Sequence, residues 1–322
     1  MTPLPVVVFN DTTRDRGHLG CETVMATIER LCAANGMEVV RRVPERRLSD
    51  DDIRRHLEGA RVAIVNGEGS LHSGRPIVDV MMRVGELARE RGVTPALVNA
   101  QWHDNPPRVR ELERFAMCSF RDEASLREAG TTNGRHVADL LLHASNRPTA
   151  ETRTRDLLVV DSVLKPKTAA LYEDATRAGA PFRVMCDRNE RRLPLRWPLV
   201  WARRRLRGLE DGNLAMRDVA TARFLVTGRF HAMLAAVQCR TPFLALESNT
   251  PKISRFVRDA GLPRECVGTF ADLERARAAW ESFDWSATDA FVSEQSRRTD
   301  RLFADIRRAA DEDACGAEAA AA

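Results

Sequence analysis

The chain has 322 residues, 43% of them hydrophobic and 30% charged, with a formal net charge of +4. This length allows two domains, and the composition is that of a globular protein. No apolar run approaches the roughly 18 to 20 residues that a membrane span needs, and the charge is too low for a dedicated nucleic-acid binder.

Strand and helix patterns alternate along the first half of the chain. Strands are predicted at 6–9, 37–43, 62–65, 95–99 and 115–119, and helices at 21–34, 50–58, 76–91 and 106–114. Such a βαβ series predicts a parallel sheet with right-handed crossovers. Residues 144–156 are polar and lack an apolar period, so we interpret them as a linker.

A second α/β series follows the linker. Its predicted strands are 157–160, 182–185, 224–226 and 243–246, with helices at 167–178 and 229–238 and a closing helical stretch at 271–309. We therefore expect two Rossmann-like domains facing each other across a cleft, which resembles a GT-B arrangement. Residues 1–150 would form the N-terminal domain and 151–310 the C-terminal one, while 311–322 would be a disordered tail.

The cysteine and histidine patterns indicate a cellular compartment, and they contain no metal-binding motif. The seven cysteines form no CxxC motif and no signal peptide is apparent, which favours free thiols in a reducing cytoplasm. No HExxH motif or Cys/His cluster occurs, so neither a metal nor another cofactor is predicted.

Residues 188–207 combine eight arginines with Trp197 and Trp201. One interpretation is peripheral contact with the inner face of a membrane, where tryptophan rings sit at headgroup depth and arginines meet anionic lipid. A solvated loop and helix explains the same composition equally well, and nucleic acid is disfavoured by the low overall charge.

The stretch 223–252 is the most informative part of the chain. Its strands are apolar almost throughout, as strands covered on both faces should be, so the turn at Gly228 is expected at the carboxyl edge of a parallel sheet. Arg229 and His231 fall in the first helical turn and are expected to face solvent, where unpaired N–H groups favour an anion. Asn249 and Lys252 should open onto the same edge.

A glycine-containing loop follows the strand 62–65. Gly67 and Gly69 allow a ligand to approach the backbone, Ser70 offers a hydroxyl, and Glu68 can bind or deprotonate a sugar hydroxyl. The loop is neither a Walker motif nor a full dinucleotide fingerprint, and a plain strand-to-helix turn is the alternative.

Arg121 directly follows another predicted strand, and Asp122 is a suitable helix N-cap. A cation at a helix N-terminus opposes the helix dipole unless an anion also binds there, so Arg121 is a candidate anion ligand. The alternative is that Arg121 pairs with Asp122 or Glu123.

Three histidines lie in predicted strand-to-helix loops and are candidate ligand-binding residues: His18, His72 and His103. Three others are expected to be structural: His56, His136 and His143.

Together these motifs resemble the polysaccharide pyruvyl transferase family. The shared motifs, in the family's order over roughly residues 5–260, are Asn66 to Ser70, Ser119 to Ser125, Val137 to Asp139, Gly228 to His231, Thr241-Pro242 and Asn249-x-x-Lys252. The R-x-H and R-D-E-x-S pieces are fairly specific in combination. Where the family usually has a run of glycines, this chain has Glu68.

The resemblance implies an enzyme that moves a pyruvyl group from phosphoenolpyruvate to a sugar of a cell-surface polysaccharide precursor, forming a pyruvate ketal. Phosphoenolpyruvate is then the donor substrate, with Arg121, Arg229 and Lys252 as its candidate cationic ligands and the C-terminal domain as the donor side. His231 would transfer a proton, and Glu68 or His72 would orient the acceptor glycan on the N-terminal side. The alternatives are a GT-B-type glycosyltransferase using a nucleotide sugar and a non-catalytic glycan-binding relative.

Overall fold

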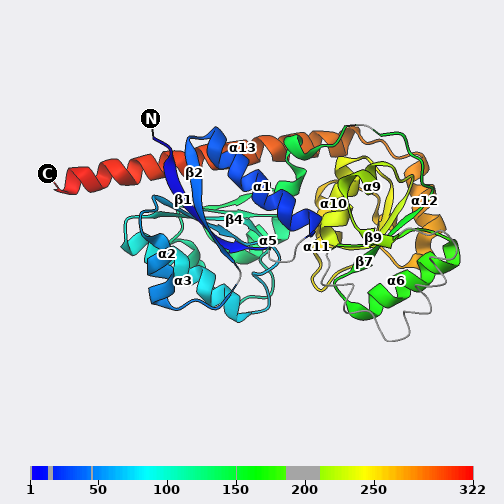
Figure 1. The fold of residues 1–322 in the computed structure, drawn as a ribbon, viewed down its shortest axis with the longest axis horizontal. Coiled ribbons are helices and arrows are strands. Elements are labelled where there is room, and N and C mark those ends of the chain that lie inside the picture. The colour runs from blue at the N-terminus through cyan, green and yellow to red at the C-terminus, as the bar shows by residue number, and fades with distance from the viewer. Residues whose placement is uncertain (1, 14–16, 45, 150, 186–210, 322) are drawn as a thin grey trace. The chain divides into compact units, whose positions relative to one another are not determined.

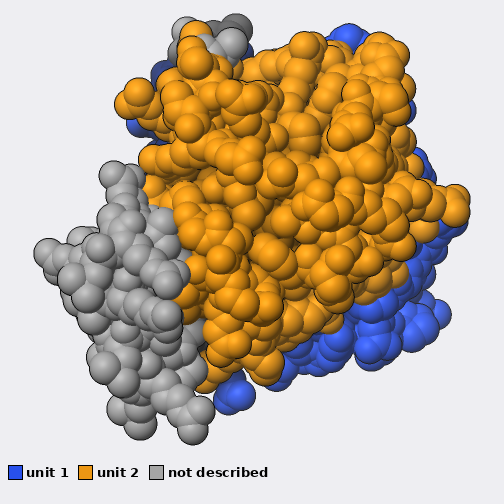
Figure 2. All heavy atoms as spheres, turned by 90° about the vertical axis from the view of Figure 1, so that its right-hand side faces the viewer, with its two compact units in different colours: residues 1–14, 24–140, 294–322 blue, residues 15–23, 141–293 orange. Residues whose placement is uncertain are grey.

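The structure is a computed structural model, and it describes residues 2–13, 17–44, 46–149, 151–185 and 211–321. It divides into two compact units, shown in two colours in Figure 2. Unit 1 comprises Met1–Arg14, Val24–Leu140 and Glu294–Ala322, and unit 2 comprises Asp15–Thr23 and Leu141–Ser293. The arginine- and tryptophan-rich segment 188–207 lies outside the described residues.

Unit 1 is built on a parallel sheet with the strand order β2-β1-β3-β4-β5-β6 (Figure 1). The strands are β1 (Leu4–Asp11), β2 (Met37–Pro44), β3 (Val62–Asn66), β4 (Thr94–Ala100), β5 (Met117–Phe120) and β6 (Gly134–His136). The helices between them are α1 (Leu19–Ala34), α2 (Asp50–Leu57), α3 (Pro76–Glu90), α4 (Val109–Leu112) and α5 (Glu123–Ala129).

Alternation along β1 places core side chains on both faces of this sheet. Val7 and Phe9 pack in the core cluster that contains α2 and α3 residues, whereas Val6 and Val8 pack with residues of α1 and of the last helix, α13 (Ser286–Ala321). Helices therefore cover both faces, which explains why the strands are apolar almost throughout.

Unit 2 contains a second parallel sheet, with the order β11-β10-β7-β8-β9. Its strands are β7 (Leu158–Ser162), β8 (Phe182–Val184), β9 (Asp211–Asn213), β10 (Leu225–Gly228) and β11 (Phe243–Ala245). The helices of the unit include α6 (Lys165–Ala178), α9 (Met216–Ala220), α10 (Phe230–Gln238), α11 (Lys252–Asp259) and α12 (Leu273–Glu281).

Each sheet has a point at which successive crossovers leave in opposite directions. In unit 1 this switch point lies between β1 and β3, and in unit 2 it lies between β7 and β10. Open α/β sheets bind ligands outside the carboxyl ends of the strands at such points. The fold therefore identifies one candidate edge in each unit.

The expected domain boundaries, 1–150 and 151–310, are wrong at the closing helix. The part of α13 that starts at Glu294 belongs to unit 1, where Leu302, Phe303 and Ile306 are fully buried in the sheet core. The first boundary falls at Leu140, ahead of the predicted linker. An amphipathic helix at the end of a chain does not reveal by its period which sheet it will cover.

The prediction of a disordered tail at 311–322 is also wrong. Helix α13 continues to Ala321, and Asp313 accepts hydrogen bonds from Arg89 Nη1 (3.0 Å) and Thr94 Oγ1 (2.5 Å). Among the described residues, no helix is both long enough and apolar enough to cross a membrane.

Candidate functional site

In unit 2, a buried ion pair joins the two strands that flank the switch point. Arg229 follows β10 and donates from Nε to Asp161 Oδ1 (3.0 Å) and from Nη2 to Asp161 Oδ2 (2.5 Å). Asp161 lies near the end of β7 and is fully buried, whereas Arg229 is 8% exposed. Burial raises the pKa of Asp161 to about 6, and the Arg229 charge opposes this rise.

Arg229 was expected to face solvent from the first helical turn, and the structure shows that this is wrong. Arg229 is the N-cap residue of α10 and is buried by its pairing with Asp161. The bidentate pairing uses Nε and Nη2, so it fixes the guanidinium plane. Asp161 was not predicted as a site residue, although an aspartate near the end of the buried strand LVVDS was the available signal.

Gly228 is required by the close approach of the two strand ends. A Cβ atom at this position would lie 2.4 Å from Ser162 Cβ, so a larger residue would separate β10 from β7. The glycine thereby positions Arg229 against Asp161.

His231 is half-buried and packs against His18 from the segment Asp15–Thr23. The two imidazole rings make an edge contact with centroids 5.7 Å apart. Gly20 also lies against His231, because a Cβ there would be 2.2 Å from the ring. The structure thus brings together two predicted site residues that are far apart in sequence.

The environment of His18 determines its protonation state. Partial burial lowers the pKa of His18 to about 3, with further lowering by the positive charges of His231, Arg229 and Lys252. His18 Nδ1 accepts a hydrogen bond from Cys21 N (3.2 Å), which places the imidazole proton on Nε2. His18 is therefore neutral at physiological pH.

Lys252 and Asn249 follow β11, as predicted. Lys252 is the first residue of α11 and donates from Nζ to Asn249 Oδ1 (3.4 Å). Its charge acts on His18, so it lies within electrostatic range of the histidine pair. Arg229, His231 and Lys252 together make this edge of unit 2 suitable for an anion.

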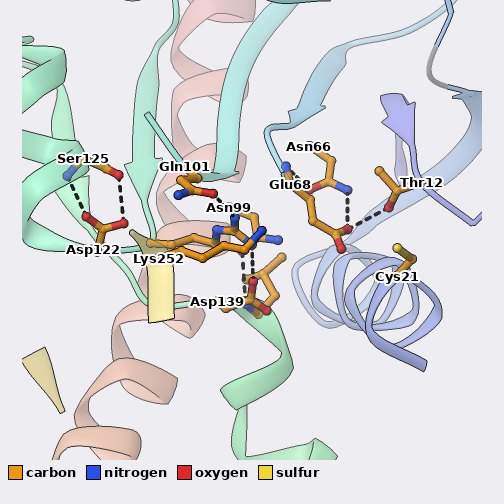
Figure 3. Close-up of polar contacts among 12 residues, drawn as sticks. Thr12, Cys21, Asn66, Glu68, Asn99, Gln101, Asp122, Ser125, Asp139 and Lys252 are labelled. Carbon is orange, nitrogen blue, oxygen red and sulfur yellow. Dashed lines mark hydrogen bonds and ion pairs between the residues drawn. The ribbon is translucent and has the colours of Figure 1, made fainter. Parts of the chain in front are cut away.

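In unit 1, Glu68 lies at the switch point between β1 and β3. Its carboxylate accepts hydrogen bonds from Thr12 Oγ1 (2.7 Å) and Asn66 Nδ2 (3.4 Å), as Figure 3 shows. Glu68 is 5% exposed and Ser70 is also buried, with Ser70 Oγ donating to Glu68 O (3.1 Å). Thr12 was not predicted as a site residue, because it meets Glu68 only through the pairing of β1 with β3.

The glycines of this loop have separate steric roles. A Cβ atom at Gly67 would lie 2.6 Å from Ala100 Cα, so only glycine fits beside β4. Gly69 has a φ of +62°, which glycine adopts without strain.

Arg121 directly follows β5. It is buried and donates to Asp139 Oδ2 (2.8 Å) and Gln101 Oε1 (3.2 Å). Asp122 instead caps α5 through Ser125 N (2.8 Å), which confirms its prediction as an N-cap (Figure 3). Asp139 thus holds Arg121 in unit 1 in the same way as Asp161 holds Arg229 in unit 2.

His72 and His103 are brought together by an isolated parallel bridge in unit 1. His72 Nδ1 lies 3.2 Å from Ser73 Oγ, and His103 Nδ1 lies 3.4 Å from Glu128 Oε2. Their partners are loop and helix side chains, so these two histidines are tied to the local structure of the loops.

Comparison with known proteins identifies a family and a fold. A family model described as polysaccharide pyruvyl transferase matches residues 41–250. No curated protein shows significant sequence similarity to the chain.

Two solved structures illustrate the fold likeness. The UDP-GlcNAc 2-epimerase of Methanocaldococcus jannaschii, in complex with UDP-GlcNAc and UDP, is 10% identical with a TM-score of 0.56, covering 93% of this chain and 99% of that chain. A putative UDP-N-acetylglucosamine 2-epimerase from Listeria monocytogenes is 8% identical with a TM-score of 0.50, covering 90% and 91%. At this identity the likeness concerns the fold alone, and it confirms the GT-B-like class with two Rossmann-like units.

Proposed function

This chain belongs to the polysaccharide pyruvyl transferase family, and on that premise we propose that it moves a pyruvyl group from phosphoenolpyruvate to a sugar of a cell-surface polysaccharide precursor. The product is a pyruvate ketal, and inorganic phosphate is released. The observation that carries the proposal is the cationic edge of unit 2, where Asp161 fixes Arg229 beside His231 and within range of Lys252.

Phosphoenolpyruvate matches this edge by charge. Its carboxylate and phosphate need donors at fixed positions, and an arginine held by a buried carboxylate is already ordered before the ligand arrives. The N-terminus of α10 starts directly after Arg229 and adds backbone N–H groups that favour an anion.

The chemistry assigns a separate role to His231. Protonation of the methylene carbon of phosphoenolpyruvate by imidazolium creates oxocarbenium character at the neighbouring carbon. Two acceptor hydroxyls form C–O bonds at that carbon, the C–O bond to phosphate breaks, and the hydroxyl protons pass to bases. His18 remains neutral, so its part is to hold the ring of His231 in place.

Thermal unfolding with ligands tests the donor assignment. Phosphoenolpyruvate should raise the melting temperature, because a ligand of the native state stabilises it, and pyruvate at the same concentration should do much less. Lys252→Gln should reduce the shift, whereas Lys165→Gln, the same charge change at the exposed start of α6, should not.

Two outcomes would redirect the proposal. Stabilisation by a UDP-sugar without stabilisation by phosphoenolpyruvate would favour a glycosyltransferase. Phosphoenolpyruvate binding without phosphate release, over a panel of glycan acceptors, would favour a non-catalytic relative.

A further inference from the structure

A row of buried asparagines occupies the carboxyl ends of three neighbouring strands in unit 1. Asn10 lies near the end of β1, Asn66 ends β3, and Asn99 lies near the end of β4, and each is at most 1% exposed. Asn99 lies on the same edge as Asn66 and Glu68 in Figure 3. Burying an amide is unfavourable unless its donors and acceptor are satisfied, so this row requires an explanation.

The backbone is strained at two of these residues. Asn10 has a φ of 63° and Asn99 a φ of 58°, the left-handed region that side-chain-bearing residues rarely adopt. The strand register shifts between Phe9 and Asp11 in one case and between Leu97 and Ala100 in the other. Such irregularities redirect side chains and are frequent beside ligand sites.

Each strained asparagine keeps one polar atom for which the described residues provide no partner. Asn10 Nδ2 donates to Asn66 O (2.5 Å) and Ser70 Oγ (3.3 Å), so the acceptor Oδ1 is left over. Asn99 Oδ1 accepts from Leu140 N (3.3 Å), so the donor Nδ2 is left over. These contacts fix both amide orientations, because a flip would oppose two donors or two acceptors.

The charge of this edge favours a neutral ligand over an anionic one. Glu68 contributes a negative charge, and the positive charge of Arg121 is neutralised by Asp139. One amide oxygen, one amide N–H and a carboxylate instead match hydroxyl groups, which both donate and accept hydrogen bonds.

We propose that the carboxyl edge of β1, β3 and β4 is a subsite for an uncharged sugar ring, bound by Asn10 Oδ1, Asn99 Nδ2 and the Glu68 carboxylate. This inference rests on the proposed function, in which the sugar is the acceptor. Thr12 and Asn66 hold the Glu68 carboxylate in place. The Glu68 carboxylate then contributes directly to the acceptor preference of this chain.

Saturation-transfer NMR on the full chain tests the subsite without requiring turnover. The neutral probes are the methyl glycosides of galactose, glucose and mannose, and the charged probes are methyl glucuronide and galactose 6-phosphate. At least one neutral glycoside should receive saturation from the protein, and the charged probes should receive less. Asn99→Asp keeps the acceptor for Leu140 N but loses the donor, and Glu68→Gln removes the charge, so each should weaken binding about tenfold.

Matched controls separate binding from general charge effects. Asn35→Asp and Glu29→Gln make the same charge changes elsewhere in unit 1 and should leave glycoside binding unchanged. Phosphoenolpyruvate should stabilise Asn99→Asp as much as the parent chain, because the donor edge belongs to unit 2. Failure of phosphoenolpyruvate to stabilise any form would count against the proposed function alone.

The subsite would be overturned by any of three results. The first is no saturation transfer to the neutral glycosides, and the second is stronger saturation transfer to the charged probes. The third is glycoside binding that survives both Asn99→Asp and Glu68→Gln.

Discussion

The Arg229–Asp161 pair makes stability and donor binding depend on the same two side chains. Arg229→Ala leaves a buried carboxylate without its partner, and we expect it to lower the free energy of unfolding by about 3–5 kcal/mol. The double variant Asp161→Leu/Arg229→Met removes both charges and should recover most of that loss. Both variants should lose stabilisation by phosphoenolpyruvate.

Urea unfolding followed by circular dichroism, with and without phosphoenolpyruvate, measures both effects. Equal instability of the single and double variants would show that the unpaired Asp161 carboxylate does not cause the loss of stability in Arg229→Ala. If phosphoenolpyruvate still stabilised the double variant, Arg229 would not be a ligand of the donor.

His18 predicts a distinct dependence of stability on pH. Its pKa is about 3 in the folded chain against 6.5 as the ordinary value, so the unfolded chain binds more protons between these limits. Stability from this residue is therefore complete above pH 6.5 and is lost as the pH falls. Relative to His18→Gln, the parent chain should lose up to about 1.4 kcal/mol per pH unit below 6.5.

Urea midpoints measured from pH 7.5 to 5 test this expectation. Asp161 has a raised pKa and contributes the opposite slope, but it is present in both proteins and cancels in the comparison. His143→Gln serves as the control for removing an imidazole. A pH-independent difference between His18→Gln and the parent chain would contradict the assignment.

Helix α13 carries the strongest prediction at the level of single elements. Its residues Leu302, Phe303 and Ile306 are fully buried against the sheet of unit 1, so Phe303→Ala should destabilise the protein by about 3–5 kcal/mol. Arg297→Ala, on the solvent side of the same helix, should change stability by less than about 0.5 kcal/mol. Urea unfolding measures both, and a similar cost at the two positions would show that α13 does not belong to the core of unit 1.

The elements themselves were largely predictable because their signals are local. Apolar runs located β1, β3, β4, β7 and β10, and Asp122 marked the start of α5. The sheet against which α13 packs was not predictable, since its apolar stripe would fit either sheet.

For the candidate site, the sequence predicts which residues lie in loops at strand ends, but not which of them meet. The sequence placed Arg229, His231 and Glu68 at sheet edges, which the structure confirms. It did not reveal Asp161 or Thr12 as their partners, because strand order decides which side chains meet. The same limit explains why Arg229 was expected in solvent.

At the scale of the molecule, the two units divide the binding chemistry. Unit 2 presents cationic groups at its switch point, and unit 1 presents amides and a carboxylate at its own. In the reaction that we propose, unit 2 would bind the anionic donor and unit 1 the neutral acceptor.

Segment 188–207 lies outside the described residues, and its composition predicts contact with a membrane. Eight arginines attract anionic lipid by roughly 1 kcal/mol each near the surface, and Trp197 and Trp201 can then seat at headgroup depth. We expect weak, reversible and salt-dependent binding to anionic vesicles, which would bring the enzyme to a lipid-linked acceptor.

Vesicle flotation at low and high salt tests this membrane contact. The intact protein should float with anionic vesicles at low salt and be released at high salt, because salt screens the attraction between arginine and lipid. Trp197→Ala/Trp201→Ala should float less than the parent chain, whereas Trp285→Ala, which removes a tryptophan of unit 2, should not differ. Equal recovery with neutral and anionic vesicles, or none with either, would return the segment to the alternative of a solvated loop.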